Sequence, residues 1–201
     1  MTAPKPPFIG LTGAIASGKS AALAALDELG AATLSTDAVT HELLGARTTV
    51  ERLVERWGPD VGTDGRIDRQ KVGEIVFAER DELAWLESIL HPLVGERVAS
   101  WRSALPTATP VAVVEVPLLF EAGMEAIFDG TLVVLAGDER RAAWLSERGD
   151  RAAEGRSGRQ LSEQDKAGRA TWVVMNDGTL DDLRRNLEAL WPELVSVRAE
   201  P

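Results

Sequence analysis

Short runs of apolar residues recur along the chain, separated by longer stretches with helical spacing. The runs cover residues 8–12, 32–34, 111–116, 130–135 and 172–175. They are short, several are rich in β-branched residues, and such runs are typical of buried strands. Strands that alternate with helices predict an α/β domain, in which a parallel sheet is flanked by helices.

Capping residues and helix breakers predict where the helices begin and end. The expected helices span residues 20–29, 38–57, 68–77, 81–90, 92–104 and 179–190. Gly30 is expected to end the first helix, and Asp68 and Thr179 are expected to act as N-caps. His91 and Pro92 mark an expected break between two helices, because proline removes a backbone donor.

One long stretch lacks the strand pattern. Residues 38–109 contain turn signals at 58–68 but no run that indicates a strand. The stretch is too long for a simple crossover, so it predicts a helical subdomain inside one domain of 201 residues. The expected parts are a core at 8–37, 110–137 and 170–191, an insertion at about 38–109 and a charged segment at about 138–168.

Composition narrows the possible functions. Lys and Arg number 22 against 32 Asp and Glu, and the net charge of -10 disfavours a nucleic-acid binder, which needs a basic surface. The absence of cysteine excludes disulfides, Fe–S clusters and cysteine nucleophiles, and two histidines disfavour a zinc site. No apolar run reaches the roughly 18 residues of a membrane span, and no signal peptide is recognisable. We therefore expect a cytoplasmic protein without a membrane partner.

A phosphate-binding motif follows the first predicted strand. Residues 13–20 read GAIASGKS and match G-x-x-x-x-G-K-[ST] at every fixed position, between a predicted strand and a predicted helix. We expect the backbone N–H groups to surround phosphate, Lys19 to reach the β- and γ-phosphates, and the Ser20 hydroxyl to bind Mg²⁺. The expected ATP-binding residues here are Gly13, Ile15, Ala16, Ser17, Gly18, Lys19, Ser20 and Ala21. The alternative is a chance glycine-rich turn.

The motif alone does not distinguish a kinase from a GTPase or a motor ATPase. The chain has no Asn-Lys-x-Asp segment of the kind that GTPases use, and large ATPases are longer. The arginine-rich residues 140–159 favour a small-molecule kinase whose lid arginines stabilise the transferred phosphoryl group. The alternative is a solvated helical face with ion pairs.

Four further residues carry open alternatives. Asp37 follows the second strand and is equally well read as a base for an acceptor hydroxyl or as an N-cap. Glu115 is expected either to lie near the metal or to reach solvent or an arginine. Glu121 is expected to be a cap or an ion-pair partner. A lone histidine such as His91 is more often structural than catalytic.

These residues together resemble the dephospho-CoA kinase family from residue 9 to about residue 190. The matching blocks are 10–13, 17–20, Asp37, 65–69, 76–77, 86–87, 90–92, 116–121, Arg148, Arg156, 160–162, Lys166, Asn176 and Gly178. The block at 116–121 is highly specific, and the order and spacing of the blocks carry the resemblance.

The resemblance implies a P-loop kinase-like fold with a helical acceptor-binding insertion and a lid. It implies ATP-dependent phosphorylation of the ribose 3′-hydroxyl of dephospho-CoA, with Mg²⁺ as cofactor. Asp37 would be the base, Arg148 with help from Arg141 would be the lid contact, His91 would shape the acceptor site, and Asn176 would join the ATP site. The rival functions are another small-molecule kinase and a nucleotide-binding regulatory module without catalysis.

Several positions depart from the family pattern. The departures are Ala14, Ala16, Ala21, Ser35, Trp144 and Thr171. Ala14 and Ala16 replace glycines, so either both adopt ordinary φ angles or the loop geometry shifts slightly. The phosphate loop and Asp37 are retained, and the oligomeric state is not predicted.

Overall fold

The computed structural model describes residues 5–63, 66–137, 140–141 and 160–197. The chain forms two compact units. One unit contains the residues up to Ser35 and those from Leu105 onward, and the other contains Thr36–Ala104.

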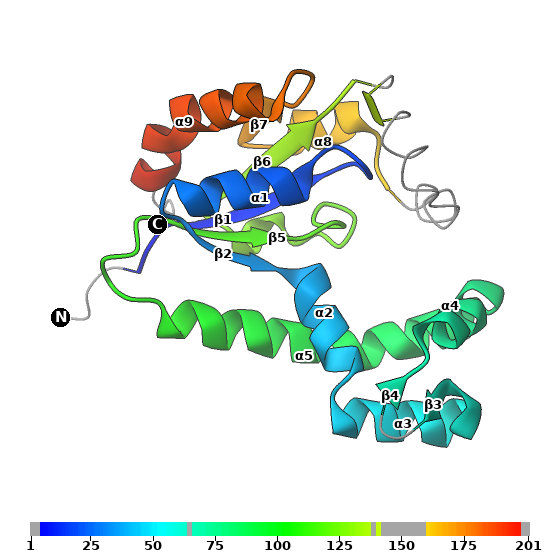
Figure 1. The fold of residues 1–201 in the computed structure, drawn as a ribbon. Helices are drawn as coiled ribbons and strands as arrows, with labels where there is room; N and C mark the ends of the chain where they lie inside the picture. The colour runs from blue at the N-terminus through cyan, green and yellow to red at the C-terminus, as the bar shows by residue number, and fades with distance from the viewer. Residues whose placement is uncertain (1–4, 64–65, 138–139, 142–159, 198–201) are drawn as a thin grey trace. The chain divides into compact units, whose positions relative to one another are not determined.

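A parallel sheet of five strands forms the centre of the first unit (Figure 1). The strand order is β2-β5-β1-β6-β7, and every pair of neighbours is parallel. This sheet confirms the predicted α/β class and all five predicted strands. The strands are β1 (Phe8–Gly13), β2 (Ala32–Ser35), β5 (Ala112–Glu115), β6 (Gly130–Leu135) and β7 (Trp172–Met175).

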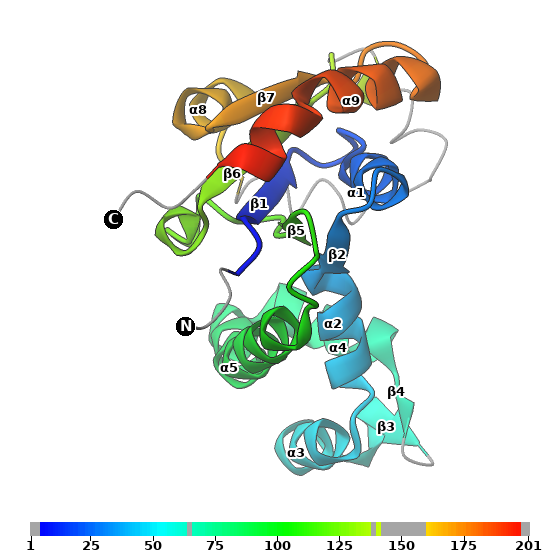
Figure 2. The same cartoon turned by 90° about the vertical axis from the view of Figure 1, so that its left-hand side faces the viewer.

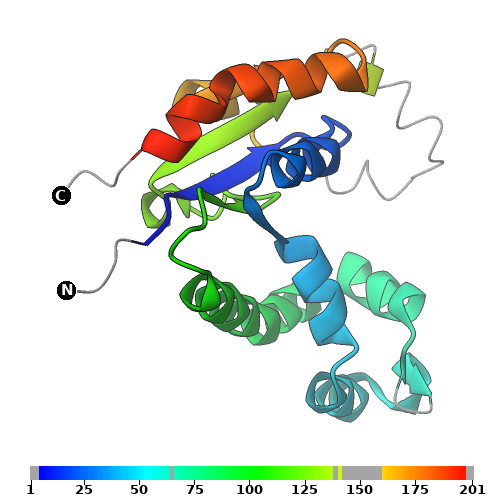
Figure 3. The same ribbon diagram turned by 60° about the vertical axis from the view of Figure 1, so that its left-hand side comes forward.

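Helices α1 (Lys19–Glu28) and α9 (Leu180–Ser196) cover one face of this sheet (Figures 2 and 3). Ile9 and Leu11 of β1 belong to the same buried cluster as residues of both helices. The intervening Gly10 points to the opposite face, where an added Cβ atom would lie 2.4 Å from Leu119 Cδ1. Alternation along β1 therefore gives the sheet two buried faces.

The predicted end of α1 and the predicted N-cap of α9 are confirmed, whereas α9 continues to Ser196, beyond the predicted end at residue 190. Gly30 follows α1 with a φ of 101°, in the left-handed region that favours glycine. The Thr179 hydroxyl accepts from the Asp182 backbone N–H, and the Asp182 carboxylate accepts from the Thr179 backbone N–H, which makes a reciprocal capping box. Two shorter elements of this unit are η2 (Glu125–Ile127) and α8 (Glu163–Arg169).

The second unit is mainly helical. Its elements are α2 (Thr36–Leu44), α3 (Arg47–Trp57), η1 (Pro59–Val61), β3 (Gly62–Thr63), β4 (Arg66–Ile67), α4 (Arg69–Ala78) and α5 (Arg80–Ala104). The Asp68 carboxylate accepts from the backbone N–H groups of Gln70 and Lys71, which confirms the predicted N-cap of α4. Leu53 and Val61 form this unit's own core together with residues of α4 and α5.

Three expectations for this unit were wrong. The single helix expected over 38–57 is two helices, because the chain turns at Gly45 and Ala46, whose N–H groups donate to Glu42 and Leu43. The turn-rich residues around 58–68 contain a short antiparallel hairpin, β3 with β4, where no strand was expected. Two-residue strands are too short to leave a periodic signal in the sequence.

The third correction concerns Pro92. Helix α5 continues through it without the break that was expected at His91. Proline inside a helix costs about 3 kcal/mol or more, because it removes a hydrogen bond and crowds the preceding turn. Packing offsets this cost, since Leu86, Ile89 and Leu90 are buried while Pro92 lies on the exposed side.

Candidate active site

Two glycines shape the loop between β1 and α1. A Cβ atom on Gly13 would lie 2.4 Å from the Val134 carbonyl oxygen and 2.6 Å from Ser17 Oγ, so no larger residue fits. Gly18 has a φ of 92°, and α1 begins directly after it at Lys19. The loop therefore brings the first turn of α1, which is the positive end of its helix dipole, to the carboxyl end of β1.

Ala16 adopts a conformation that glycine adopts more easily. Its φ is 62°, and no other non-glycine residue of the described ranges has a positive φ. An L-residue there costs roughly 1–2 kcal/mol. Ala14 keeps an ordinary φ, so the replacement of glycine is accommodated without strain at Ala14 and with strain at Ala16.

Lys19 folds back onto the loop that precedes it. Its Nζ donates to the carbonyl oxygens of Gly13 at 3.2 Å and Ala14 at 2.8 Å, and its side chain is half-buried. The following Ser20 is exposed in the first turn of α1, and Ala21 is half-buried. The ammonium group is thus held beside the backbone that the motif assigns to phosphate binding.

Two side chains hold the outward carbonyls of the loop. Arg141 Nε donates to the Ile15 oxygen at 3.4 Å, and Asn176 Nδ2 donates to the Ser17 oxygen at 2.9 Å. In a trans peptide the C=O and the next N–H point in opposite directions. The N–H groups of Ala16 and Gly18 therefore point away from these two donors.

Asn176 reaches the loop from the end of β7. Its side chain is 2% exposed, and its own backbone N–H donates to the Leu135 oxygen at 2.8 Å. The sequence assigned Asn176 to ATP binding, whereas the amide is engaged with the Ser17 carbonyl. Its contact in the structure supports the loop from behind.

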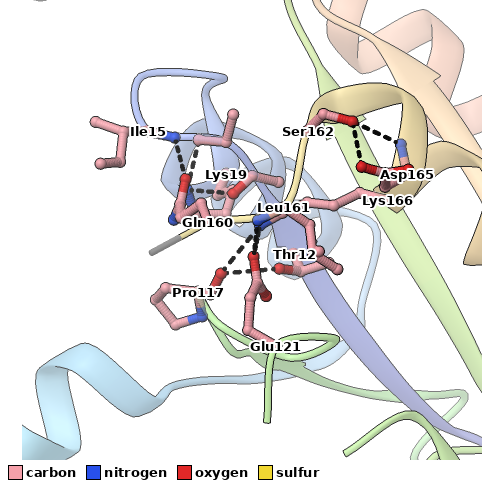
Figure 4. A network of polar contacts seen from close by, with 12 residues as sticks. Thr12, Ile15, Lys19, Pro117, Glu121, Gln160, Leu161, Ser162, Asp165 and Lys166 are labelled. Atoms are coloured by element: carbon pink, nitrogen blue, oxygen red, sulfur yellow. Dashed lines mark hydrogen bonds and ion pairs between the residues drawn. The ribbon is translucent and has the colours of Figure 1, made fainter. Parts of the chain in front are cut away.

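Gln160 was not among the predicted site residues, although it lies in a matching family block. Its Oε1 accepts from the Ile15 backbone N–H at 3.2 Å (Figure 4). Arg141 contacts the carbonyl of the same Ile15, and its Nη1 lies 3.4 Å from Glu163 Oε1. Arg141 and Gln160, both from the charged segment at about 138–168, therefore contact the same loop residue.

Comparison with known proteins decides the family. Residues 7–182 match the dephospho-CoA kinase family. A dephospho-CoA kinase from Symbiobacterium thermophilum is 41% identical over 92% of this chain and 80% of its own length. The chain belongs to the dephospho-CoA kinase family.

Solved structures agree with this family's fold. A crystal structure from Thermus thermophilus is 36% identical, with a TM-score of 0.80 over 95% of this chain and 99% of its own. A dephospho-CoA kinase from Campylobacter jejuni, at 24% identity, shares the fold with a TM-score of 0.71 over 94% of this chain and 96% of its own. The P-loop kinase-like fold implied by the resemblance is confirmed.

Asp37 is the residue that the resemblance assigned to the family's aspartate after the second strand. It is the second residue of α2, two positions beyond the end of β2, and it is exposed. Since α2 already begins at Thr36, Asp37 is not its N-cap, and that alternative was wrong. As a first-turn carboxylate it interacts favourably with the helix dipole.

His91 lies exposed on α5, in the same helical unit as Asp37. No histidine other than His91 was predicted to belong to the site. In this unit the guanidinium of Arg69, from the 65–69 family block, contacts the imidazole of His41, and Arg69 Nη2 donates to the His41 oxygen at 3.4 Å. A polar pair between α2 and α4 was not foreseen, because the two residues are far apart in the sequence.

The structure shows the surroundings of the two glutamates that the sequence left with alternative roles. Glu121 forms an ion pair with Lys166, which confirms the ion-pair alternative. Glu115 is 5% exposed at the end of β5, opposite Leu11 of β1 and Ser35 of β2, so the solvent alternative was wrong. Of the departures from the family pattern, Thr171 exchanges hydrogen bonds with Thr131, whereas Trp144 lies outside the described residues, as do Arg148 and Arg156.

The described ranges contain no group of three or more His, Asp or Glu side chains that could hold a metal ion. Among the helices described, none is long and apolar enough to cross a membrane.

Proposed function

We propose that the chain transfers the γ-phosphoryl group of ATP to the ribose 3′-hydroxyl of dephospho-CoA. The products are CoA and ADP, and the reaction is the last step of coenzyme A synthesis. The observation that carries this proposal is the family match over residues 7–182, together with a phosphate loop whose peptide planes are held by Lys19, Arg141 and Asn176.

The proposed ATP site uses the loop and the start of α1. The backbone of residues 13–18 and the N-terminus of α1 receive the phosphates, and Lys19 moves its ammonium group from the loop carbonyls to phosphate oxygens. Mg²⁺ is the proposed cofactor, with the Ser20 hydroxyl as its protein ligand. When bound, this ion would neutralise charge on the phosphates.

The proposed base is Asp37. The ribose oxygen attacks the γ-phosphorus, the proton of the hydroxyl passes to the Asp37 carboxylate, and ADP leaves. Its exposure and its position in the first turn of α2 support this role. Positioning and charge stabilisation supply most of the rate enhancement in such transfers.

The acceptor is proposed to bind to the helical unit, with His91 among the residues that shape its site. Arg148 is the proposed lid contact to the transferred group, with help from Arg141, which already contacts the phosphate loop. The cytoplasm, where ATP is abundant, is the proposed location. No nucleic acid or membrane partner is proposed.

A coupled ADP-release assay tests the function. Purified chain is mixed with Mg²⁺ and ATP and is offered dephospho-CoA, a nucleoside, a nucleotide and shikimate in parallel, and mass spectrometry identifies the product. Turnover on dephospho-CoA alone, with CoA as product, supports the proposal. Preference for another acceptor indicates a different small-molecule kinase. ATP binding without turnover on any acceptor indicates a regulatory module.

A further inference from the structure

A lysine is completely buried near the phosphate loop. Lys166 of α8 has 0% exposed side chain, and its Nζ lies 2.9 Å from Glu121 Oε1, whose side chain is 12% exposed. Glu121 follows β5 in the highly specific 116–121 block. A charge taken out of water is tolerated only with a partner of opposite charge, so the two residues depend on each other.

The same carboxylate holds the backbone that leads into α8. Glu121 Oε1 also accepts from the Leu161 backbone N–H at 2.8 Å. Lys166 Nζ donates a long hydrogen bond of 3.4 Å to the Pro117 oxygen. The pair therefore orients both the start of the α8 segment and the chain that follows β5.

This cluster is connected to the phosphate loop at two points (Figure 4). The Pro117 oxygen also accepts from the hydroxyl of Thr12, the residue before Gly13, at 3.2 Å. Gln160, next to Leu161, accepts from the Ile15 N–H at 3.2 Å. The position of the Gln160 backbone is thus set by its neighbour's bond to Glu121.

Stability alone does not account for an ionic pair here. Replacing a buried ion pair by well-packed apolar residues is often neutral or stabilising. Glu121 Oε2 is buried without a hydrogen-bond partner among the described residues, so the pair is not even fully satisfied. Unlike apolar contacts, its hydrogen bonds to Lys166 and Leu161 have fixed directions, which suits a role in placing atoms.

We propose that Glu121 and Lys166 are positioning residues for ATP binding, acting through Gln160 on the Ile15 peptide of the phosphate loop. Gln160 holds the N–H of the Ala14–Ile15 peptide and Lys19 holds its C=O. When Lys19 turns to phosphate, as proposed above, Gln160 is left to hold this peptide. The inference rests on the proposed function only in taking ATP as the ligand of this loop.

The first test removes the acceptor of Gln160. Gln160→Met keeps the length of the side chain, and Gln164→Met on the exposed side of α8 is the matched control. We expect the KM for ATP to rise and kcat/KM for ATP to fall about tenfold in Gln160→Met, the order of one lost hydrogen bond. The KM for dephospho-CoA and the melting temperature should stay near the parent values, and Gln164→Met should match the parent.

The second test breaks the ion pair and then restores charge balance. Glu121→Gln leaves Lys166 buried and unpaired, so it lowers the melting temperature as well as ATP affinity. The double variant Glu121→Met with Lys166→Met removes the buried charge together with the acceptor of the Leu161 N–H, and it should recover the melting temperature. Its kcat/KM for ATP should remain at least tenfold below that of the parent, because the orientation of Gln160 is not restored.

A second ion pair on α8 provides the control. Arg169 and Glu125 are also paired, with side chains 40% and 36% exposed. Glu125→Gln removes the same carboxylate charge from the same unit, and it should leave the KM for ATP unchanged. A purely structural role for Glu121 would lower the active fraction and hence kcat, without a change in the KM for either substrate.

Titration with a non-hydrolysable ATP analogue separates this inference from the proposed function. If the parent binds the analogue but does not phosphorylate dephospho-CoA, the proposed function fails while the comparison of analogue affinities still tests the positioning role. Parent-like analogue affinity in both Gln160→Met and the charge-balanced double variant would overturn the inference.

Discussion

The unit with the sheet and the helical unit present their candidate residues in opposite ways. Lys19, Arg141 and Asn176 are each hydrogen-bonded to the phosphate-loop backbone. Asp37 and His91, in the helical unit, are exposed. The proposed phosphate site is therefore held by hydrogen bonds within the protein, whereas the proposed acceptor residues are exposed at the surface.

This difference has a physical reason. A phosphate group is recognised by backbone N–H groups, whose direction must be set by bonds on the other side of each peptide. A base must keep its charge free for the hydroxyl that it deprotonates. Variants on the phosphate side should thus affect ATP binding and turnover together, and variants on the acceptor side should affect turnover alone.

The largest effect is expected for Lys19→Ala. A single donor to the transition state is worth about 10²–10³-fold, and Lys19 also holds two loop carbonyls, so activity should fall by more than about 10³-fold. Turnover and analogue titration should both report the loss, and the melting temperature without ligand should change little. Lys71→Ala on α4 is the control. A large fall in melting temperature for Lys19→Ala but not for the control would mean that Lys19 mainly stabilises the fold.

Asp37→Asn should lower turnover without lowering affinity for ATP, and it therefore distinguishes the acceptor site from the phosphate site. Turnover is expected to fall about 10²-fold or more, because a positioned base contributes about 10²–10⁴-fold. Affinity for the ATP analogue should be retained. Asp81→Asn, another exposed first-turn carboxylate of the helical unit, should behave like the parent. A decrease in turnover of less than tenfold would require another base.

Arg141→Ala and Arg148→Ala sharpen the comparison within the charged segment. Arg141 contacts the Ile15 carbonyl, so its loss should raise the KM for ATP about tenfold, the order of one charged hydrogen bond. Arg148→Ala should lower kcat more than it raises the KM, because a lid arginine acts on charge that develops in the transition state. Steady-state kinetics at varied ATP concentration distinguishes the two variants. Parent-like turnover in Arg148→Ala would mean that Arg148 is a solvated surface residue without a role in phosphoryl transfer.

Replacing alanines of the loop by glycine should have effects of opposite sign. Ala16→Gly relieves a left-handed φ of 62° while adding chain entropy, so the free energy of unfolding should rise by no more than about 1 kcal/mol. Ala14→Gly loses a buried methyl group without relieving strain, so the melting temperature should fall. Thermal melts check both, and equal decreases would show that Ala16 is not strained.

The smallest effect is expected at the N-cap of α9. Hydrogen bonds from Thr179 lower the pKa of Asp182 from 3.8 to about 2. A lowered pKa stabilises the fold above pH 3.8, and this contribution is lost as the pH falls toward 2. The melting temperature of Asp182→Asn should therefore decline less steeply than that of the parent over this range. Asp181→Asn, which is outside the capping box, should keep the parent slope.

Local patterns determined much of the fold and part of the site. The five strands, the phosphate loop and the caps at Asp68 and Thr179 were all predicted, because each depends on residues adjacent in sequence. The course of α5 through Pro92 was not predicted, because buried leucines outweigh a local breaker. The split between α2 and α3 was also missed, because the turn at Gly45 lies within a stretch of continuous helical propensity.

The amino-acid sequence by itself was enough to predict the phosphate loop and an aspartate after the second strand. It was also enough to place the chain in a family of kinases. Only the tertiary structure decided which side chains hold that loop. Gln160 and Asn176 lie more than a hundred residues from Ile15 and Ser17, with separations of 145 and 159 residues. Contacts of that kind leave no periodicity and no motif, because they arise when strands and helices pack and bring the ends of β1 and β7 and the start of α8 together.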